Sequence, residues 1–154
     1  MDFKVRRSGH IVLRVADVER SARFFQDVLG LKLIGSQARQ MYFLTADFDA
    51  NHHQVLVRPA RPEAPAPDSD GRIGLASASF DIGTLNDLKA LHARLLKAGA
   101  TVERSEDRGA IKALFVRDPD GNLFELYCRE GKGPPALADR YTVRGTLDHL
   151  LAPA

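Results

Sequence analysis

The sequence of 154 residues has little of what marks several large classes of protein. Its single cysteine, Cys128, excludes a disulfide within the chain. No apolar run reaches the length of a membrane-spanning helix, and no apolar segment follows the basic residues near the N-terminus as a signal sequence would require. These absences favour a cytoplasmic protein that has no membrane partner.

An excess of charge of one sign is also missing. The 22 basic and 20 acidic residues leave a formal net charge of +2, and they are scattered without long runs. No basic stripe alternates with aromatic residues, so a nucleic-acid partner is not expected. An apolar share of 44% and a charged share of 27% are ordinary for one globular domain with a hydrophobic core. We therefore expect a small molecule as the ligand.

The first half of the chain has the pattern of one β-α-β-β-β unit. Apolar residues alternate at its start and then recur every three to four residues between Asp17, which is suited to cap a helix, and Leu29. Gly30 follows, where a helix often ends in a left-handed residue. The pattern predicts a strand over 10–15, a helix over 17–29, and strands over 31–34, 41–45 and 53–57.

The second half repeats this pattern. It predicts a strand over 77–82, a helix from Thr84 to Gly99, and strands over 101–103, 111–116 and 123–128. Aligning the glycines that end the two helices, Gly30 and Gly99, and allowing one or two gaps equates His10 with Ser77 and Gln54 with Glu125.

We therefore expect a single domain, 1–154, built of two modules. The modules span about 8–58 and 74–130, and a proline-rich connector, 59–73, joins them. For the tail, 131–154, a short docking helix and disorder are both open.

A tight turn near the end of the second module is followed by a carboxylate in an apolar strand. Residues 118–122 read Asp-Pro-Asp-Gly-Asn, which is typical of a turn between antiparallel strands. On the outgoing strand, alternation puts Phe124 and Leu126 on one face and Glu125 on the other. A carboxylate in an apolar strand lies at an open rim, is paired, or binds a metal. Glu125 is therefore the first candidate site residue, and an ion pair with Arg14 is its ordinary alternative.

The two β-α-β-β-β units, His10 at the start of the first strand, and the Asp-Pro-Asp-Gly-Asn-x-x-Glu motif resemble the vicinal oxygen chelate superfamily. This superfamily includes glyoxalase I, bleomycin- and fosfomycin-resistance proteins, and type I extradiol dioxygenases. The resemblance covers about residues 8–130, and the segment 43–57 with its His52-His53 pair is most similar to small single-domain relatives of the dioxygenases. It implies an α+β fold in which two βαβββ repeats form a cupped eight-stranded mixed sheet with flanking helices.

The resemblance also implies a divalent-metal site, with Fe(II) or another ion, at the positions of His10, Gln54, Ser77 and Glu125. The dioxygenases use the first, third and fourth of these positions. Ser77 stands where they place their second histidine, and a neutral hydroxyl is a poor ligand for iron or zinc. The candidate metal ligands are therefore His10 and Glu125, with Gln54 as the third, and Glu125 is also the candidate catalytic group.

Two further positions differ from the dioxygenase pattern. Arg108 stands where those relatives carry an acid–base histidine, and Phe115 stands where they carry a tyrosine that donates a hydrogen bond. Alternation along the predicted strands adds further polar residues to the same face. The candidate substrate-binding residues are Arg14, Ser77, Ser79, Asp81, Arg108, Phe115 and Tyr127.

Two functions remain open from the sequence. The first is a divalent-metal-dependent enzyme that acts on a small oxygen-chelating substrate, with ring cleavage made doubtful by Ser77, Arg108 and Phe115. The alternative is a metal-free protein that binds or sequesters a small molecule, as bleomycin-resistance proteins do. The resemblance further implies a homodimer, which would cover exposed sheet edges.

Overall fold

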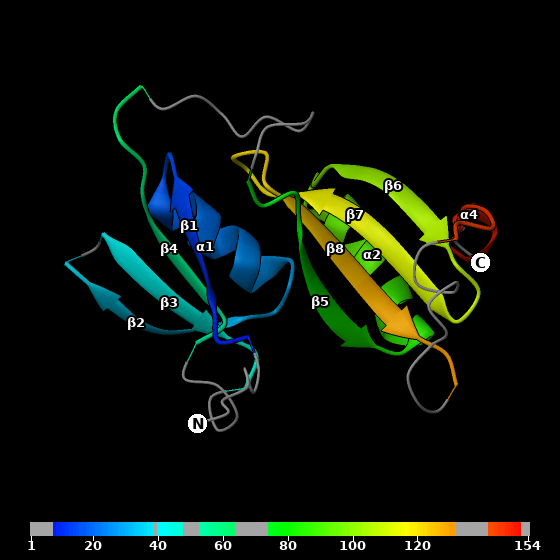
Figure 1. Ribbon diagram of the computed structural model, residues 1–154. Helices are drawn as coiled ribbons and strands as arrows, with labels where there is room; N and C mark the ends of the chain where they lie inside the picture. Colours follow the sequence, from blue (N-terminus) through cyan, green and yellow to red (C-terminus); the bar gives the residue numbers. More distant parts are fainter. Residues whose placement is uncertain (1–7, 39, 48–52, 64–73, 132–141, 152–154) are drawn as a thin grey trace, which may run out of the picture. The chain divides into compact units, whose positions relative to one another are not determined.

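A computed structural model of the protein describes residues 8–38, 40–47, 53–63, 74–131 and 142–151. The chain divides into two compact units, Met1–Pro65 and Ala66–Ala154. Each unit contains a four-stranded sheet, and a helix packs against one face of that sheet (Figure 1). The α+β class and the two βαβββ repeats predicted from the sequence are therefore confirmed.

The first unit has its strands in the order β1-β4-β3-β2, with β1 and β4 parallel and the other pairs antiparallel. Asp17 begins the helix as expected, because its carboxylate accepts the backbone N–H groups of Glu19 and Arg20 at 2.9 and 3.0 Å. The elements are β1 (Ile11–Val15), α1 (Val18–Asp27), β2 (Lys32–Gln37), β3 (Met41–Thr45) and β4 (Val55–Pro59).

The second unit has the same topology, in the order β5-β8-β7-β6. Thr84 and Asp87 form a capping box at the start of its helix, which satisfies two backbone N–H groups reciprocally. The elements are β5 (Ala78–Gly83), α2 (Leu85–Lys97), β6 (Val102–Asp107), β7 (Ile111–Arg117), β8 (Leu123–Arg129) and α4 (Asp148–Leu151).

The core of the second unit lies between α2 and one face of the sheet. Leu88 and Leu95 of the helix are fully buried, as are Leu114 of β7 and Leu126 of β8. Because side chains alternate along a strand, Glu125 lies on the opposite face, as predicted. The sheet therefore has an apolar face under the helix and a polar face away from it.

Two strands are longer than the sequence pattern predicts. β2 continues to Gln37 instead of ending at 34, and β6 continues to Asp107 instead of ending at 103. The added part of β6 reads Arg-Ser-Glu-Asp, which has no apolar alternation to identify it as a strand. Its charged side chains are instead paired with charges on the same sheet face.

The C-terminal tail, for which two alternatives were open, includes a docked segment. Leu147 is fully buried, and the short helix α4 packs against α2. Residues 132–141 and most of the proline-rich connector lie outside the described residues. Across the described ranges, no helix is long and apolar enough to cross a membrane.

The turn between β7 and β8 is built around Asp118, which is 5% exposed. Its Oδ1 accepts the N–H groups of Asp120 and Asn122 at 3.0 and 2.8 Å, and its Oδ2 accepts the side-chain amide of Asn122 at 2.8 Å. Gly121 takes a φ of +91°, which glycine adopts without strain. Burial raises the pKa of Asp118, although these hydrogen bonds oppose the shift. The turn that delivers Glu125 is thus held mainly by the Asp118 side chain, and Arg117 Nη1 also donates to the carbonyl of Gly121 at 2.7 Å.

Replacing Asp118 with alanine removes three acceptor contacts from this partly buried turn. We expect the free energy of unfolding, measured by urea denaturation, to fall by about 2 kcal/mol. Asp118→Asn keeps one carbonyl oxygen for the backbone N–H groups and should lose about half as much. Equal stability of Asp118→Ala and the parent chain would contradict this account of the turn.

Candidate functional site

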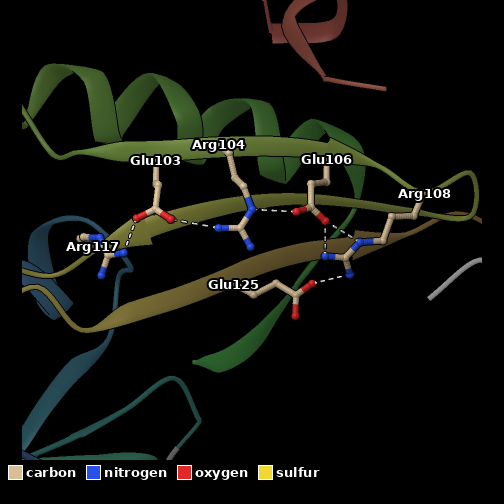
Figure 2. Close-up of polar contacts among 6 residues, drawn as sticks. All are labelled: Glu103, Arg104, Glu106, Arg108, Arg117 and Glu125. Atoms are coloured by element: carbon tan, nitrogen blue, oxygen red, sulfur yellow. Dashed lines mark hydrogen bonds and ion pairs between the residues drawn. The ribbon is translucent and has the colours of Figure 1, made fainter. Parts of the chain in front are cut away.

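A ladder of alternating charges crosses the polar face of the second sheet (Figure 2). Register explains the alignment, because Arg104 of β6 pairs with Phe115 of β7, and Phe115 pairs with Glu125 of β8. Paired residues project from the same side of a sheet. The charge ladder consists of Arg117, Glu103, Arg104, Glu106, Arg108 and Glu125, in that order.

Each neighbour in the charge ladder is within ion-pair distance of the next. The separations are 2.5 Å for Arg117–Glu103, 3.0 Å for Glu103–Arg104, 2.7 Å for Arg104–Glu106, 2.5 Å for Glu106–Arg108 and 2.7 Å for Arg108–Glu125. Three arginines and three glutamates thereby neutralise one another across three strands.

Glu125 has a partner on each carboxylate oxygen. Its Oε1 accepts from Arg108 Nη1 at 2.7 Å, and its Oε2 accepts the hydroxyl of Ser79 at 2.6 Å. Only 17% of the Glu125 side chain is exposed. The sequence interpretation considered an ion pair of Glu125 with Arg14, whereas the ion pair in the structure is with Arg108. Glu125 is therefore an anchored carboxylate within its own unit.

Arg108 is held between two carboxylates in a largely buried position. Its side chain is 12% exposed, and both Nε and Nη2 donate to Oε2 of Glu106. Burial lowers the pKa of Arg108, but the bonds to Glu106 and the charge of Glu125 outweigh it and raise that pKa above its usual value. Arg108 is therefore a permanent cation beside Glu125.

Glu106 is the central acceptor of the charge ladder. Burial raises its pKa, but the hydrogen bonds and charges of Arg104 and Arg108 outweigh burial, and the pKa of Glu106 lies below its usual value. The sequence analysis named neither Glu106 nor Arg104 as site residues. Their i, i+2 spacing in a polar segment was a usable signal, because it puts both on one face of a strand.

Phe115 lies beneath two guanidinium groups. The Cζ atoms of Arg104 and Arg108 are 3.5 and 5.5 Å from the centroid of its ring. A guanidinium stacked on an aromatic face is held by cation–π attraction and dispersion. Phe115, which was predicted to bind substrate, is 5% exposed, and its ring packs against the guanidinium of Arg104.

The remaining predicted residues of this unit follow β5 and β8. Asp81 forms an exposed ion pair with Arg129 at 3.3 Å and accepts the N–H of Gly83 at 2.9 Å. Tyr127, which is partly exposed, pairs with Asp81 across the two strands. Ser77 directly precedes β5 and is two residues from the hydroxyl that bonds Glu125.

The strand register shows that Ser79, and not Ser77, is the residue opposite Glu125. In the first unit Ile11 pairs with Val55, which brings His10 and Gln54, the residues before them, to the same level. In the second unit the residue opposite Glu125 is Ser79. Alignment of the helix ends equated His10 with Ser77, whereas the strand pairing makes Ser79 its counterpart. A histidine placed at Ser79 would lie beside Glu125.

In the first unit, His10 and His53 are in contact. Their ring centroids are 4.2 Å apart, and the ring of His53 meets that of Phe43 edge-on at 5.3 Å. His53 is half-buried. His52, considered beside it, lies outside the described residues.

Gln54 and Arg14 complete the predicted residues of the first unit. The side-chain oxygen of Gln54 accepts the backbone N–H of Ala46 at 2.6 Å. Arg14 is exposed on β1, opposite Arg58 of β4. The side-chain oxygen of Gln54, its best metal-binding atom, is thus already hydrogen-bonded to the loop that follows β3.

A divalent ion fits this donor set poorly. Each oxygen of Glu125 already accepts a hydrogen bond, and one of the donors is the Arg108 cation, which repels a second cation at the same carboxylate. The oxygen of Gln54 is engaged as well. Within the described ranges, no three His, Cys, Asp or Glu side chains are grouped so that they would hold a metal.

Breaking the Arg108–Glu125 pair should be costly. Arg108→Ala leaves the largely buried carboxylate of Glu125 without its cation and leaves Glu106 with Arg104 alone, and we expect a loss of about 3 kcal/mol in the free energy of unfolding. Arg129→Ala, which removes an exposed ion pair with Asp81, is the matched control and should cost less than about 1 kcal/mol. Equal losses for the two variants in chemical denaturation would refute the buried pair.

The lowered pKa of Glu106 predicts a difference in acid stability. Because the folded-state pKa lies below the unfolded value of about 4.3, the ionised carboxylate stabilises the fold above that pH, and the contribution is lost as pH falls through the folded pKa. Glu106→Gln lacks this ionisation. Stability measured from pH 7 downward should therefore fall less steeply below about pH 4.5 in the variant than in the parent. Curves of stability against pH that run parallel in the two proteins would disprove this role of Glu106. The raised pKa of Asp118 contributes with the opposite sign, but it does so equally in both proteins.

Comparisons with known proteins agree with this architecture. The family model described as the Glyoxalase/Bleomycin resistance protein/Dioxygenase superfamily matches residues 7–126. The chain is 32% identical over 127 residues to virulence protein STM3117 of Salmonella typhimurium, covering 78% of this chain and 82% of that protein. It is 31% identical over 121 residues to biphenyl-2,3-diol 1,2-dioxygenase 3 of Rhodococcus globerulus, covering 78% of this chain but only 62% of the dioxygenase.

A solved structure shows the same fold. The glyoxylase/bleomycin resistance protein/dioxygenase domain from Frankia sp. superposes with a TM-score of 0.70 at 22% identity, covering 84% of this chain and 96% of that one. The family match spans both repeats and includes the Asp-Pro-Asp-Gly-Asn turn and Glu125. The chain therefore belongs to the glyoxalase/bleomycin resistance protein/dioxygenase superfamily.

Proposed function

We propose that this protein binds a small organic molecule on the polar face of its second sheet, without a divalent metal at Glu125. The observation that carries the proposal is the state of the Glu125 carboxylate, which accepts from Arg108 at 2.7 Å and from Ser79 at 2.6 Å. A ligand position in the family's metal site is thereby occupied by the chain's own donors. The role is that of a binding or sequestering protein of the bleomycin-resistance type.

Arg108 supplies at this position the positive charge that a metal would otherwise bring. A metal ion at Glu125 would lie beside the Arg108 cation and be repelled by it, unless Glu125 left Arg108, whose side chain is 12% exposed and would keep only Glu106 among its carboxylate partners in the ladder. Uncovering a charge in such a place costs several kcal/mol, about 3 or more. The ion pair thus opposes metal binding energetically.

The chemistry of the ligand follows from the surface around the charge ladder. The ladder is neutral as a whole, so a net charge on the ligand is not required. Arg104, 43% exposed and stacked on Phe115, offers a planar face with hydrogen-bond donors. Ser79, Asp81 and Tyr127 add hydroxyl and carboxylate groups along β5 and β8. These groups favour a planar molecule that carries hydroxyl or carbonyl oxygens, and Ser77 remains a further candidate contact.

A metal-dependent enzyme is the second candidate. It is favoured by the contact between His10 and His53, which gathers imidazoles in the first unit, and by the relative from Rhodococcus, which is named as a dioxygenase. In this reading His10, Gln54 and Glu125 are the ligands, Glu125 is also the catalytic group, and the metal would stabilise a bound oxyanion of the substrate. The homodimer and the cytoplasmic location remain predictions from the sequence.

Metal analysis separates the two candidates. The protein is purified without chelators, incubated with Fe(II), Mn(II), Ni(II) or Zn(II), desalted, and measured by inductively coupled plasma mass spectrometry. We expect less than about 0.1 equivalent of any metal, because Glu125 is held by Arg108. One equivalent of metal that is lost in Glu125→Gln would overturn the proposal and establish the metal-dependent alternative.

Two paired variants serve as the positive control for this measurement. In an Arg108→Ala background, Ser79→His puts an imidazole opposite a released Glu125, and Ser77→His puts it two residues away along β5. We expect metal affinity to rise at least about 10-fold more with Ser79→His, since imidazole and carboxylate then share one level of the sheet.

A further inference from the structure

The C-terminal segment 142–151 pairs with the edge strand β6. The N–H of Arg144 donates to the carbonyl of Asp107 at 2.7 Å, and the N–H of Asp107 donates to the carbonyl of Gly145 at 2.8 Å. These bonds make an antiparallel bridge between Asp107 and Gly145. In Figure 1, α4 lies beside the end of β6. The segment is therefore attached to the strand that carries half of the charge ladder.

Leu147 anchors this segment to the second unit. Its side chain is fully buried, its N–H donates to the hydroxyl of Ser105 at 3.0 Å, and the helix α4 that follows packs against α2. Burial of one leucine side chain contributes about 2 kcal/mol. Val143, in the same segment, is 52% exposed and makes no comparable contribution.

Arg144 lies against the turn that joins β6 to β7. Gly109 in this turn has a φ of +81°, and a Cβ there would stand 2.7 Å from Cζ of Arg144. The same turn is tied from inside, because Oδ1 of Asp107 accepts the N–H of Gly109 at 2.8 Å and pairs with Lys112 Nζ at 2.9 Å. The turn is thus packed between an internal carboxylate and the guanidinium of the C-terminal segment.

Arg108 is the residue of this turn that enters the charge ladder. It stands between Asp107, which pairs with the segment, and Gly109, which Arg144 covers. From there its side chain reaches Glu106 and Glu125. We propose that residues 142–151 act as a strap that positions Arg108 on Glu125, so that the state of the strap determines whether the Glu125 carboxylate is engaged.

This inference rests on the proposed function, because it describes how the cation at the binding site is kept in place. With the strap docked, Arg108 holds Glu125. With the strap released, the turn loses the backbone bridge at Asp107 and the cover of Arg144, and Arg108 gains freedom to leave the carboxylate. Arg144, Gly145 and Leu147 are therefore positioning residues of the site, although none of them belongs to the charge ladder.

The test follows the Nε–H proton of Arg108 by nuclear magnetic resonance in the protein without added ligand or metal. A hydrogen bond to Glu106 slows the exchange of this proton with water. In Leu147→Ala we expect its exchange to become about 10-fold faster, because the strap has lost its buried anchor. Arg104 Nε–H also donates to Glu106 but lies in a strand, so its exchange should change less.

Val143→Ala is the matched control, since it makes a similar truncation at an exposed position of the same segment and should leave Arg108 unchanged. If Leu147→Ala fails to fold, Arg144→Ala decides the question, because it removes the guanidinium that covers Gly109 and should give about threefold faster exchange. Unchanged Arg108 exchange in a folded Leu147→Ala protein whose Asp107 N–H exchanges faster would overturn the strap. If Leu147→Ala does not fold, unchanged exchange of the Arg108 Nε–H proton in Arg144→Ala would also overturn the strap.

The strap and the proposed function fail in different ways. Retention of one equivalent of metal by the parent chain would end the metal-free proposal, while the proton exchange of Arg108 would still report on the strap. Conversely, exchange of the Arg108 Nε–H proton that does not depend on the strap would leave the result expected from the metal analysis unchanged.

Discussion

The ion pair between Arg108 and Glu125 is the constraint around which the second sheet is arranged. A carboxylate held 17% exposed on a sheet face is costly unless it is paired, and Arg108 supplies the charge. Arg108 is itself largely buried and needs Glu106 to be stable, and Glu106 in turn also accepts from Arg104. Each charged side chain is therefore stabilised by its neighbours of opposite charge, and removal of one member of the ladder leaves the next with fewer partners.

The two repeats share a topology but have different surfaces on the sheet face away from the helix. In the first unit this face carries Val12, 48% exposed, the exposed Arg14, and Phe43, whose ring meets that of His53 edge-on. In the second unit it carries the charge ladder over Phe115. The same βαβββ fold thus supports a neutralised charge ladder in one unit and a surface of different composition in the other, which is why membership of the superfamily does not by itself decide the function.

Local signals in the sequence were sufficient for most of the fold. Helical periodicity, the caps at Asp17 and Thr84, and the turn around Asp118 each depend on residues within a few positions of one another. The polar half of β6 was missed because it has no apolar alternation, and the contacts that support it across strands, Phe115 under Arg104 and Lys112 beside Asp107, are not displayed by a local pattern. The register that puts Ser79 opposite Glu125 likewise depends on pairing between distant strands, and the gapped alignment of the repeats gave a position two residues away.

Of the candidate site, the sequence singled out Glu125 but not the groups that engage it. Its Oε1 accepts from Arg108 and its Oε2 from Ser79, so a metal ion at this carboxylate would lie beside the Arg108 cation and compete with it. The balance between them is set by how firmly Arg108 is held in its turn. Since that turn is bonded to residues 144 and 145, which lie outside both repeats, the chemistry open to Glu125 depends on a part of the chain that the repeat itself does not contain.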